Sequence, residues 1–274
     1  QRYLTFLQTI YPRWRRIEGA SAEVIPNIHP ANRTDGYPKS AAGQAGFHMT
    51  DTSCPIAANT YASAYASAQT ALHAADLVLQ GERATYALCR PPGHHAFAEL
   101  AGGFCYLNNS GIAAQRLTDA GRRIAILDVD LHHGNGTQGM FYHRADVLTV
   151  SLHAHPERFY PFFWGYETEF GSGEGEGANL NLPLDRGTGD DGFLAALDLA
   201  MAKVQTWGAD TLVLALGLDA FKGDPFAGLT VTTQGFARIG GAIAAMGLPT
   251  VIVQEGGYLC PELSDNLQAI LTAF

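Results

Sequence analysis

Apolar runs of strand length alternate with longer stretches of helical pattern along most of the chain. The runs predict buried strands at residues 85–89, 123–128, 147–153, 211–216 and 250–254. The longer stretches predict helices at residues 58–80, 110–119, 190–205, 233–246 and 262–273. Strands that alternate with helices in this way are typical of parallel sheets. We therefore expect an α/β fold, with a single domain over residues 1–274 and a mostly parallel, doubly wound sheet that carries helices on both faces.

The N-terminal fifth of the chain departs from this alternation. Residues 18–57 form a long irregular stretch that contains several prolines and glycines. A segment of this kind is either functional, for example an interaction arm, or an ordinary surface loop, and both interpretations stay open. The chain opens without Met, and apolar residues recur at helical spacing over residues 3–10. We therefore expect that an N-terminal piece precedes Gln1.

Composition narrows the class of protein. The 274 residues are 47% hydrophobic and 16% charged, as in a folded globular domain. The formal net charge of −9 gives no electrostatic footprint for nucleic acid or an anionic membrane, and it is compatible with a cationic substrate. Four scattered cysteines without a C-x-x-C pair favour a reducing, cytoplasmic setting. No apolar run approaches the length of a membrane span.

The densest chemistry follows the strand predicted at residues 123–128. Asp128, Asp130, His132 and His133 fall within six positions and are followed by Gly134 and Gly136. Alternate residues of an extended segment point the same way, so Asp128, Asp130 and His132 can share one side. The plainer interpretation is a polar loop whose Asp residues cap a helix. Four side chains of ligand type in so short a stretch favour a metal site.

Three other predicted strands also end in reactive side chains. These are His94 and His95, then Asp219, and then Tyr258. The carboxyl ends of parallel strands meet at one edge of a sheet, where ligands bind. Two carboxylates and one imidazole suit a divalent ion with positions left for water and substrate. A nearby His can move a proton, and a Tyr hydroxyl can donate to a developing oxyanion.

The motifs that carry these residues resemble the arginase/deacetylase fold and, within it, the zinc-dependent histone deacetylase family. They are RPPGHHA, GGFCYLNN, ILDVDLHHGNGTQ, VSLH, GLD followed by GDP, and EGGY, and they run in family order along the whole chain. The loop PFFWGYETEFGSGEGEG and the long segment before residue 57 are most similar to the bacterial acetylpolyamine amidohydrolase branch.

The resemblance implies roles for individual residues. Asp130, His132 and Asp219 would bind Zn²⁺, with Fe²⁺ as the alternative metal. His95 would be the general base, His94 its electrostatic partner or an acid, and Tyr258 would polarise the acetyl carbonyl. Asp128 would fix His94 from behind the metal ligands. Asn135 would face His95, at a position where other members carry Asp, so we expect the pKa of the base to be tuned differently in this chain.

The resemblance also implies a substrate tunnel and structural potassium. The tunnel would be lined by Gly103, Phe104 and Tyr160, with an acidic residue, Asp51, at its entrance. One K⁺ would bind at Asp128, Asp130, His132, Ser151 and Leu152. A second would bind at Phe141, Arg144 and Val147.

Other polar residues receive plainer interpretations. His73, His133 and His143 match no family role, and we interpret them as structural or surface residues. Asp224 is interpreted as a turn residue rather than a ligand. Glu174 and Glu176 could attract a cationic amine, but a solvated Gly/Glu loop is the favoured interpretation.

These features predict a metal-dependent amidohydrolase that removes acetyl from a primary amine, with acetylpolyamines as the leading substrate class. Acetyl-lysine in proteins or peptides is the alternative substrate, and a longer acyl group is compatible. From another class, the chain could be an inactive ligand-binding relative; a purely structural protein would not need the metal ligands. An arginase-type ureohydrolase needs a two-metal acidic cluster that these motifs do not match. Residues 18–57 are the expected arm of a homodimer, and neither nucleic acid nor membrane is an expected partner.

Overall fold

The computed structural model describes residues 48–49, 53–98 and 100–274. Its strands are β1 (His48–Met49), β2 (Pro55–Ile56), β3 (Ala84–Ala87), β4 (Ile124–Asp128), β5 (Val147–Ala154), β6 (Asn179–Leu184), β7 (Thr211–Leu216) and β8 (Thr250–Gln254). Its helices are α3 (Thr60–Leu79), α4 (Asn109–Asp119), α5 (Asn135–Phe141), α6 (Asp190–Trp207), α7 (Thr233–Ala245), α8 (Leu263–Leu271) and the short 3₁₀ turn η2 (Gly173–Gly175). The predicted fold class is confirmed, and each strand and helix predicted between residues 58 and 273 agrees with an observed one to within a few residues. The helical pattern over residues 3–10 lies outside the described residues.

A six-stranded sheet in the order β3-β8-β7-β4-β5-β6 forms the centre of the molecule, and every neighbouring pair in it is parallel. Three of its four inner strands, β7, β4 and β5, are buried along their whole length. Continuous apolar runs such as IAILD and TLVLAL form these strands because helices cover both of their faces. A separate two-stranded antiparallel sheet pairs β1 with β2.

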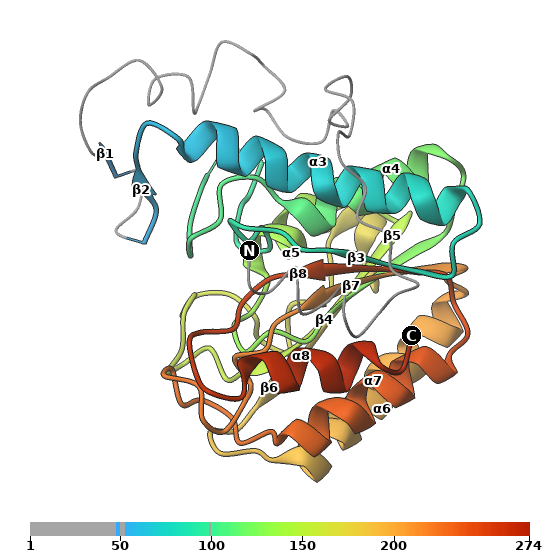
Figure 1. Ribbon diagram of the computed structural model, residues 1–274. Helices are drawn as coiled ribbons and strands as arrows, with labels where there is room; N and C mark the ends of the chain where they lie inside the picture. Colours follow the sequence, from blue (N-terminus) through green and yellow to red (C-terminus); the bar gives the residue numbers. More distant parts are fainter. Residues whose placement is uncertain (1–47, 50–52, 99) are drawn as a thin grey trace.

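Helices cover the sheet in two layers (Figure 1). α3 and α4 pack together on one face and, with Phe141 of α5, bury an apolar cluster against Ile124, Ile126 and Val251. α6, α7 and α8 lie on the other face over a larger cluster, which includes Leu127, Leu214 and Phe236. None of the helices in the described ranges combines the length and the apolar character that crossing a membrane requires.

Strand β6 has no counterpart among the predicted elements. Its sequence NLNLPL alternates polar and apolar residues, but the buried side chains are Asn179 and Asn181, whereas the leucines are half-buried. Both asparagine amides donate to Gln138 Oε1, at 3.1 and 2.8 Å. A polar inner side and Pro183 on an edge strand hide the strand pattern in the sequence.

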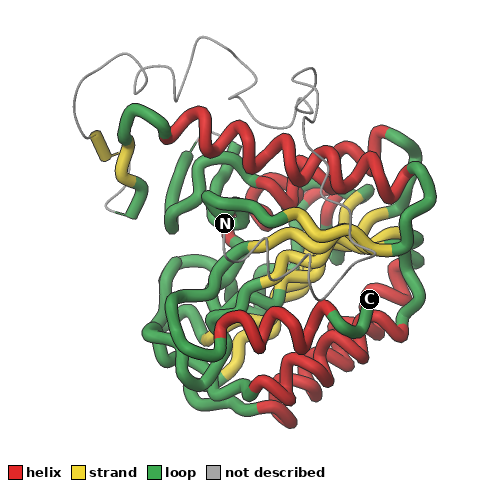
Figure 2. The backbone as a smooth tube through the Cα atoms, in the orientation of Figure 1, coloured by secondary structure: helices red, strands yellow, loops and turns green. Residues whose placement is uncertain are grey.

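The sheet topology changes direction at the ends of β4 and β7. These two strands are neighbours, but the chain leaves β4 through α5 towards β5 and leaves β7 through α7 towards β8 on the other side. Strands whose connections diverge in this way form a topological switch point, where α/β proteins bind ligands. The loops that follow the strands gather at this edge (Figure 2).

Candidate active site

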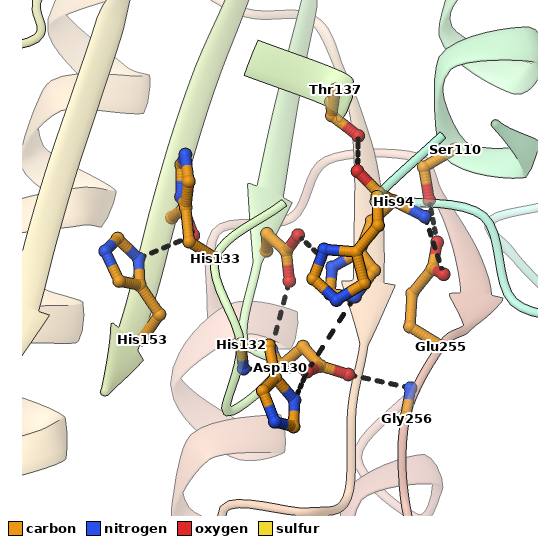
Figure 3. Close-up of polar contacts among 12 residues, drawn as sticks. His94, Ser110, Asp130, His132, His133, Thr137, His153, Glu255 and Gly256 are labelled. Atoms are coloured by element: carbon orange, nitrogen blue, oxygen red, sulfur yellow. Dashed lines mark hydrogen bonds and ion pairs between the residues drawn. The ribbon is translucent and has the colours of Figure 1, made fainter. Parts of the chain in front are cut away.

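Three potential metal ligands meet at the switch point. Asp130 and His132 follow β4, and Asp219 follows β7. The Nδ1 atom of His132 lies 3.2 Å from Asp130 Oδ1 and 3.1 Å from Asp219 Oδ2. One ligand atom from each residue lies within 4.8 Å of the other two, and all three residues are buried. Figure 3 shows His132 beside Asp130 at this point. The sequence predicted this set, and the structure brings it together.

The charges in this cluster suit a cation. Burial opposes charge on His132, yet its hydrogen bonds with Asp130 and Asp219 raise its pKa to about 10. Burial and the negative charge of Asp130 raise the pKa of Asp219 to about 7. The buried carboxylates of Asp130 and Asp219, which both lie close to His132 Nδ1, therefore need a positive charge between them. A divalent ion supplies that charge, so the donor set fits a metal.

Glycines allow the backbone to approach the two carboxylates. A Cβ at Gly217 would lie 2.2 Å from Asp130 Oδ2, and one at Gly256 would lie 2.4 Å from Asp219 Oδ2. The N–H of Gly256 donates to Asp130 Oδ2 at 2.7 Å, and the N–H of Leu131 donates to Asp219 Oδ1 at 2.9 Å. Each carboxylate is thus oriented by a main-chain amide from another segment.

Two histidines from the loop after β3 lie next to the cluster. His94 Nδ1 donates to Asp128 Oδ2 at 2.8 Å, and His95 Nδ1 donates to Asn135 Oδ1 at 2.8 Å. Burial opposes charge on His94, but the carboxylates of Asp128 and Asp130 raise its pKa to about 10. Burial and the imidazoles of His94 and His132 hold the pKa of His95 well below its usual value. At neutral pH the pair therefore contains one charged and one neutral imidazole.

Glu255 holds the histidine loop in place, and sequence reasoning missed it. Its Oε2 accepts from the N–H groups of Gly93 and His94 at 2.6 and 3.0 Å, and its Oε1 accepts from Ser110 Oγ at 2.7 Å (Figure 3). Burial raises its pKa to about 7. The available signal was an acid directly after the apolar run TVIVQ.

A second group of potential ligands, His94, Cys105 and Glu255, is less suited to a metal. Glu255 already accepts three hydrogen bonds, and His94 is paired with Asp128. Cys105 Sγ donates to Gly103 O at 3.3 Å, and burial keeps its pKa well above the usual value. A protonated thiol is a poor metal ligand.

Aromatic side chains surround the histidines and the metal cluster. The ring of Tyr160 lies edge-on to His95, with centroids 4.8 Å apart. The ring of Phe226 lies 4.4 Å from that of Tyr258 and 5.3 Å from that of His132, and Phe104 lies 6.3 Å from Tyr258. Burial and the carboxylates of Asp219 and Asp130 raise the pKa of Tyr258 far above its usual value, so its hydroxyl stays protonated.

Glycine is needed at position 103, because the backbone there passes close to His95 and Tyr160. A Cβ at this position would lie 2.2 Å from His95 Cδ2 and 2.9 Å from Tyr160 Cε1, and its φ of +52° also favours glycine. Its N–H donates to Ser53 Oγ at 2.9 Å. Phe226, by contrast, was not predicted from the sequence, because a lone aromatic residue in a loop carries no signal.

The remaining predicted residues lie as follows. Asp51 lies outside the described residues. Asp128 and Ser151 are register partners at the ends of β4 and β5, with Leu152 next along β5. Phe141, Arg144 and Val147 lie together at the turn from α5 to β5, where Arg144 N–H donates to Phe141 O at 2.9 Å.

The polar residues outside the family pattern are also placed. His133 is buried and its Nδ1 lies 3.3 Å from Ser151 Oγ, which in turn bonds His153 Nδ1 at 2.8 Å (Figure 3). His143, Glu174 and Glu176 are exposed, and His73 is half-buried. Asp224 lies in a turn, as predicted, and is buried.

Comparisons with known proteins show which family the chain resembles. The family model described as "Histone deacetylase domain" matches residues 2–274. An acetylpolyamine amidohydrolase of Burkholderia pseudomallei is 46% identical over 273 residues, which cover 99% of this chain and 80% of that protein. The acetylpolyamine amidohydrolase of Mycoplana ramosa is 41% identical, over 98% of this chain and 79% of that protein. A crystal structure of acetylpolyamine aminohydrolase from Burkholderia pseudomallei superposes with a TM-score of 0.81 at 43% identity, covering 100% of this chain and 80% of that one.

Proposed function

Because the chain belongs to the histone deacetylase family of hydrolytic deacetylases, we propose that it hydrolyses the acetamide of acetylpolyamines to acetate and the free amine. The observation that carries this proposal is the meeting of Asp130, His132 and Asp219 with two differently charged histidines at the switch point. The amidohydrolase relatives, at 46% and 41% identity, support the substrate class.

The metal is part of the proposal, with Zn²⁺ preferred and Fe²⁺ as the alternative. Asp130, His132 and Asp219 would hold it. A divalent ion at this position would lower the pKa of its water and polarise the acetyl carbonyl. Three protein ligands leave coordination positions for the water and for the acetyl carbonyl, as catalytic sites require.

The side chains around the metal ligands would move the protons. His95 is neutral, and because its Nδ1–H is held by Asn135, its Nε2 is the atom that takes a proton from water. His94 stays charged against Asp128 and either stabilises the developing negative charge or gives a proton to the leaving amine. The protonated hydroxyl of Tyr258 would donate to the oxyanion.

The tunnel assignment rests on the placement of Gly103, Phe104 and Tyr160. Gly103 and Tyr160 lie against His95, and Phe104 faces Tyr258. Aromatic walls of this kind suit an alkyl chain that carries a cationic amine. The net charge of −9 supports a cationic substrate as well. Acetyl-lysine in peptides remains the alternative substrate, since it presents the same acetamide on an alkyl stem.

The proposal is tested by acetate release from acetylputrescine, acetylspermidine and an acetyl-lysine peptide, with Zn²⁺-loaded wild type and Tyr258→Phe. We expect preference for the small polyamines and a loss of kcat of about 10²- to 10³-fold in the variant, because one oxyanion donor is removed. Preference for the peptide would move the function to protein deacetylation. No turnover of any substrate by the metal-loaded wild type would contradict the enzymatic proposal itself.

Asn135→Asp is expected to move the acid limb of the pH profile of kcat/KM. A carboxylate at 2.8 Å from His95 Nδ1 stabilises the protonated imidazole, so the pKa of His95 rises. The base is then protonated at a higher pH, and the limb should shift upward by roughly one unit or more. The measurement is kcat/KM from pH 5 to 9 for both proteins. Coincident acid limbs would mean that His95 is not the titrating base.

The proposal also includes structural potassium, a homodimer and a cytoplasmic setting. The paired ends of β4 and β5 and the turn after α5 support the two K⁺ sites. Exchange of K⁺ for tetramethylammonium should lower the melting temperature of the protein. The dimer rests on the resemblance of residues 18–57 and is tested by light scattering. All four cysteines are free thiols, which supports a reducing compartment and is tested by cell fractionation.

A further inference from the structure

Asp224 contacts the backbone of two aromatic residues at the active site. Its Oδ1 accepts from the N–H of Phe226 at 2.9 Å, and its Oδ2 accepts from the N–H of Tyr258 at 3.0 Å. The residue is only 4% exposed. Asp224 belongs to the loop between β7 and α7, whereas Tyr258 belongs to the loop after β8. One buried carboxylate therefore joins the two loops.

The segment before Tyr258 lacks side chains that could position this residue. Gly256 and Gly257 precede it, and both pass close to other groups. A Cβ at Gly256 would collide with Asp219 and Asp130, and one at Gly257 would lie 2.9 Å from Leu218 Cβ. Gly257 also has a φ of +126°, which only glycine adopts readily. Gly256 is held through its own N–H and carbonyl groups, and the hydrogen bond from the Tyr258 amide to Asp224 fixes the backbone at the tyrosine itself.

The second bond of Asp224 fixes the ring against which Tyr258 packs. Phe226 lies at 4.4 Å and 63° to the Tyr258 ring, and at 5.3 Å and 90° to the ring of His132. Phe226 thus contacts both the candidate oxyanion donor and a candidate metal ligand. Asp224 therefore holds the main-chain amide of Phe226 and that of its neighbour Tyr258.

We propose that Asp224 is a positioning residue, which places the Tyr258 hydroxyl for the reaction by holding the amides of Tyr258 and Phe226. The inference rests on the proposed function. Asp224 lies outside the cluster of metal ligands, and its two oxygens are each engaged by a main-chain amide. Its turn hydrogen bonds, from its N–H to Phe221 O and from Ala227 N–H to its O, are made by the main chain and do not require a carboxylate.

Asp224→Asn is the first test. Asparagine has a single acceptor oxygen, so one of the two amides loses its partner. We expect kcat on acetylputrescine to fall about tenfold to a hundredfold, because a misplacement of about 1 Å can cost ~10²-fold. KM and the metal content per chain should stay at the wild-type values, since Asp224 is not placed to bind the substrate or the metal.

A double-mutant cycle with Tyr258→Phe separates positioning from a general structural effect. When the hydroxyl is absent, Asp224→Asn has nothing left to position and should change kcat less than about twofold. Equal factors in both backgrounds, or wild-type kcat for Asp224→Asn alone, would overturn the inference. If Asp224→Asn does not fold, Asp224→Glu replaces it in the same cycle, because it keeps the charge and both acceptors while displacing them.

Asp190→Asn is the matched control, because Asp190 at the start of α6 contacts Thr232 at the other end of the loop between β7 and α7. Asp190 Oδ1 accepts from the N–H of Thr232 at 2.7 Å, and its Oδ2 accepts from Thr232 Oγ1 at 2.6 Å. This change removes the same kind of contact, and kcat should stay at the wild-type value. A fall as large as that of Asp224→Asn would overturn the assignment. Inactive metal-loaded wild type would contradict the proposed function instead, so the two failures are distinguishable.

Discussion

Asp219→Asn is expected to lower kcat by about 10³-fold or more and to leave the purified protein with little bound metal. Asp219 is one of the three proposed ligands, and the amide that replaces it carries no charge to hold a divalent ion. Polarisation by a metal is worth several kcal/mol, and about 1.4 kcal/mol corresponds to a factor of ten. Acetate release and metal content per chain, measured on the same preparation, test both parts of the expectation.

Asp210→Asn is the matched control for this substitution. Asp210 lies just before β7 and Asp219 just after it, so the two aspartates flank opposite ends of one strand. Asp210 accepts from the N–H of Arg123 at 3.2 Å and from Thr211 Oγ1 at 2.8 Å, away from the metal cluster. Metal content and kcat should stay at wild-type levels in the control. Full metal content with wild-type kcat in Asp219→Asn would contradict the ligand assignment.

The core of this site could be predicted because its side chains follow apolar strands directly. Once residues 124–128 and 211–216 are recognised as parallel strands, their ends must share one edge of the sheet, and Asp130, His132 and Asp219 then lie together. The identity of these residues and their spacing from the strands carry the information that places them together. The continuous apolar strands of the sheet centre were predicted for the same reason, since burial on both faces leaves a clear pattern.

The supporting carboxylates could not be predicted in the same way. Glu255 accepts from the main-chain amides of Gly93 and His94 in another loop. Asp224 accepts from the amide of Phe226 in its own loop and from that of Tyr258 in another. Every non-proline residue has such an amide, so the partner of a carboxylate leaves no mark in the sequence. Strand β6 was missed for a related reason, because its buried side is polar and bonds to Gln138 rather than to apolar neighbours. Contacts of this kind depend on where the loops meet in space.

His95→Ala is expected to lower kcat by about 10²- to 10⁴-fold, the range for loss of a positioned general base. The structure gives His95 two properties that a base needs at neutral pH. Burial and the neighbouring imidazoles of His94 and His132 keep it neutral, and Asn135 fixes its tautomer by accepting from Nδ1. Because His95 is not a ligand, metal content should match the wild type, which separates this loss from that of Asp219→Asn.

The control for His95→Ala is His143→Ala, a substitution of an exposed histidine whose Nδ1 lies 3.3 Å from Ser172 O. It should leave kcat unchanged. Imidazole in the assay buffer offers a further test, because truncation of His95 leaves room for a small base between Tyr160 and Gly103. Partial recovery of His95→Ala by imidazole, with a pH dependence that follows the pKa of the added base, would identify the missing group as a proton acceptor. A variant that keeps wild-type kcat would contradict the assignment of His95 as the general base.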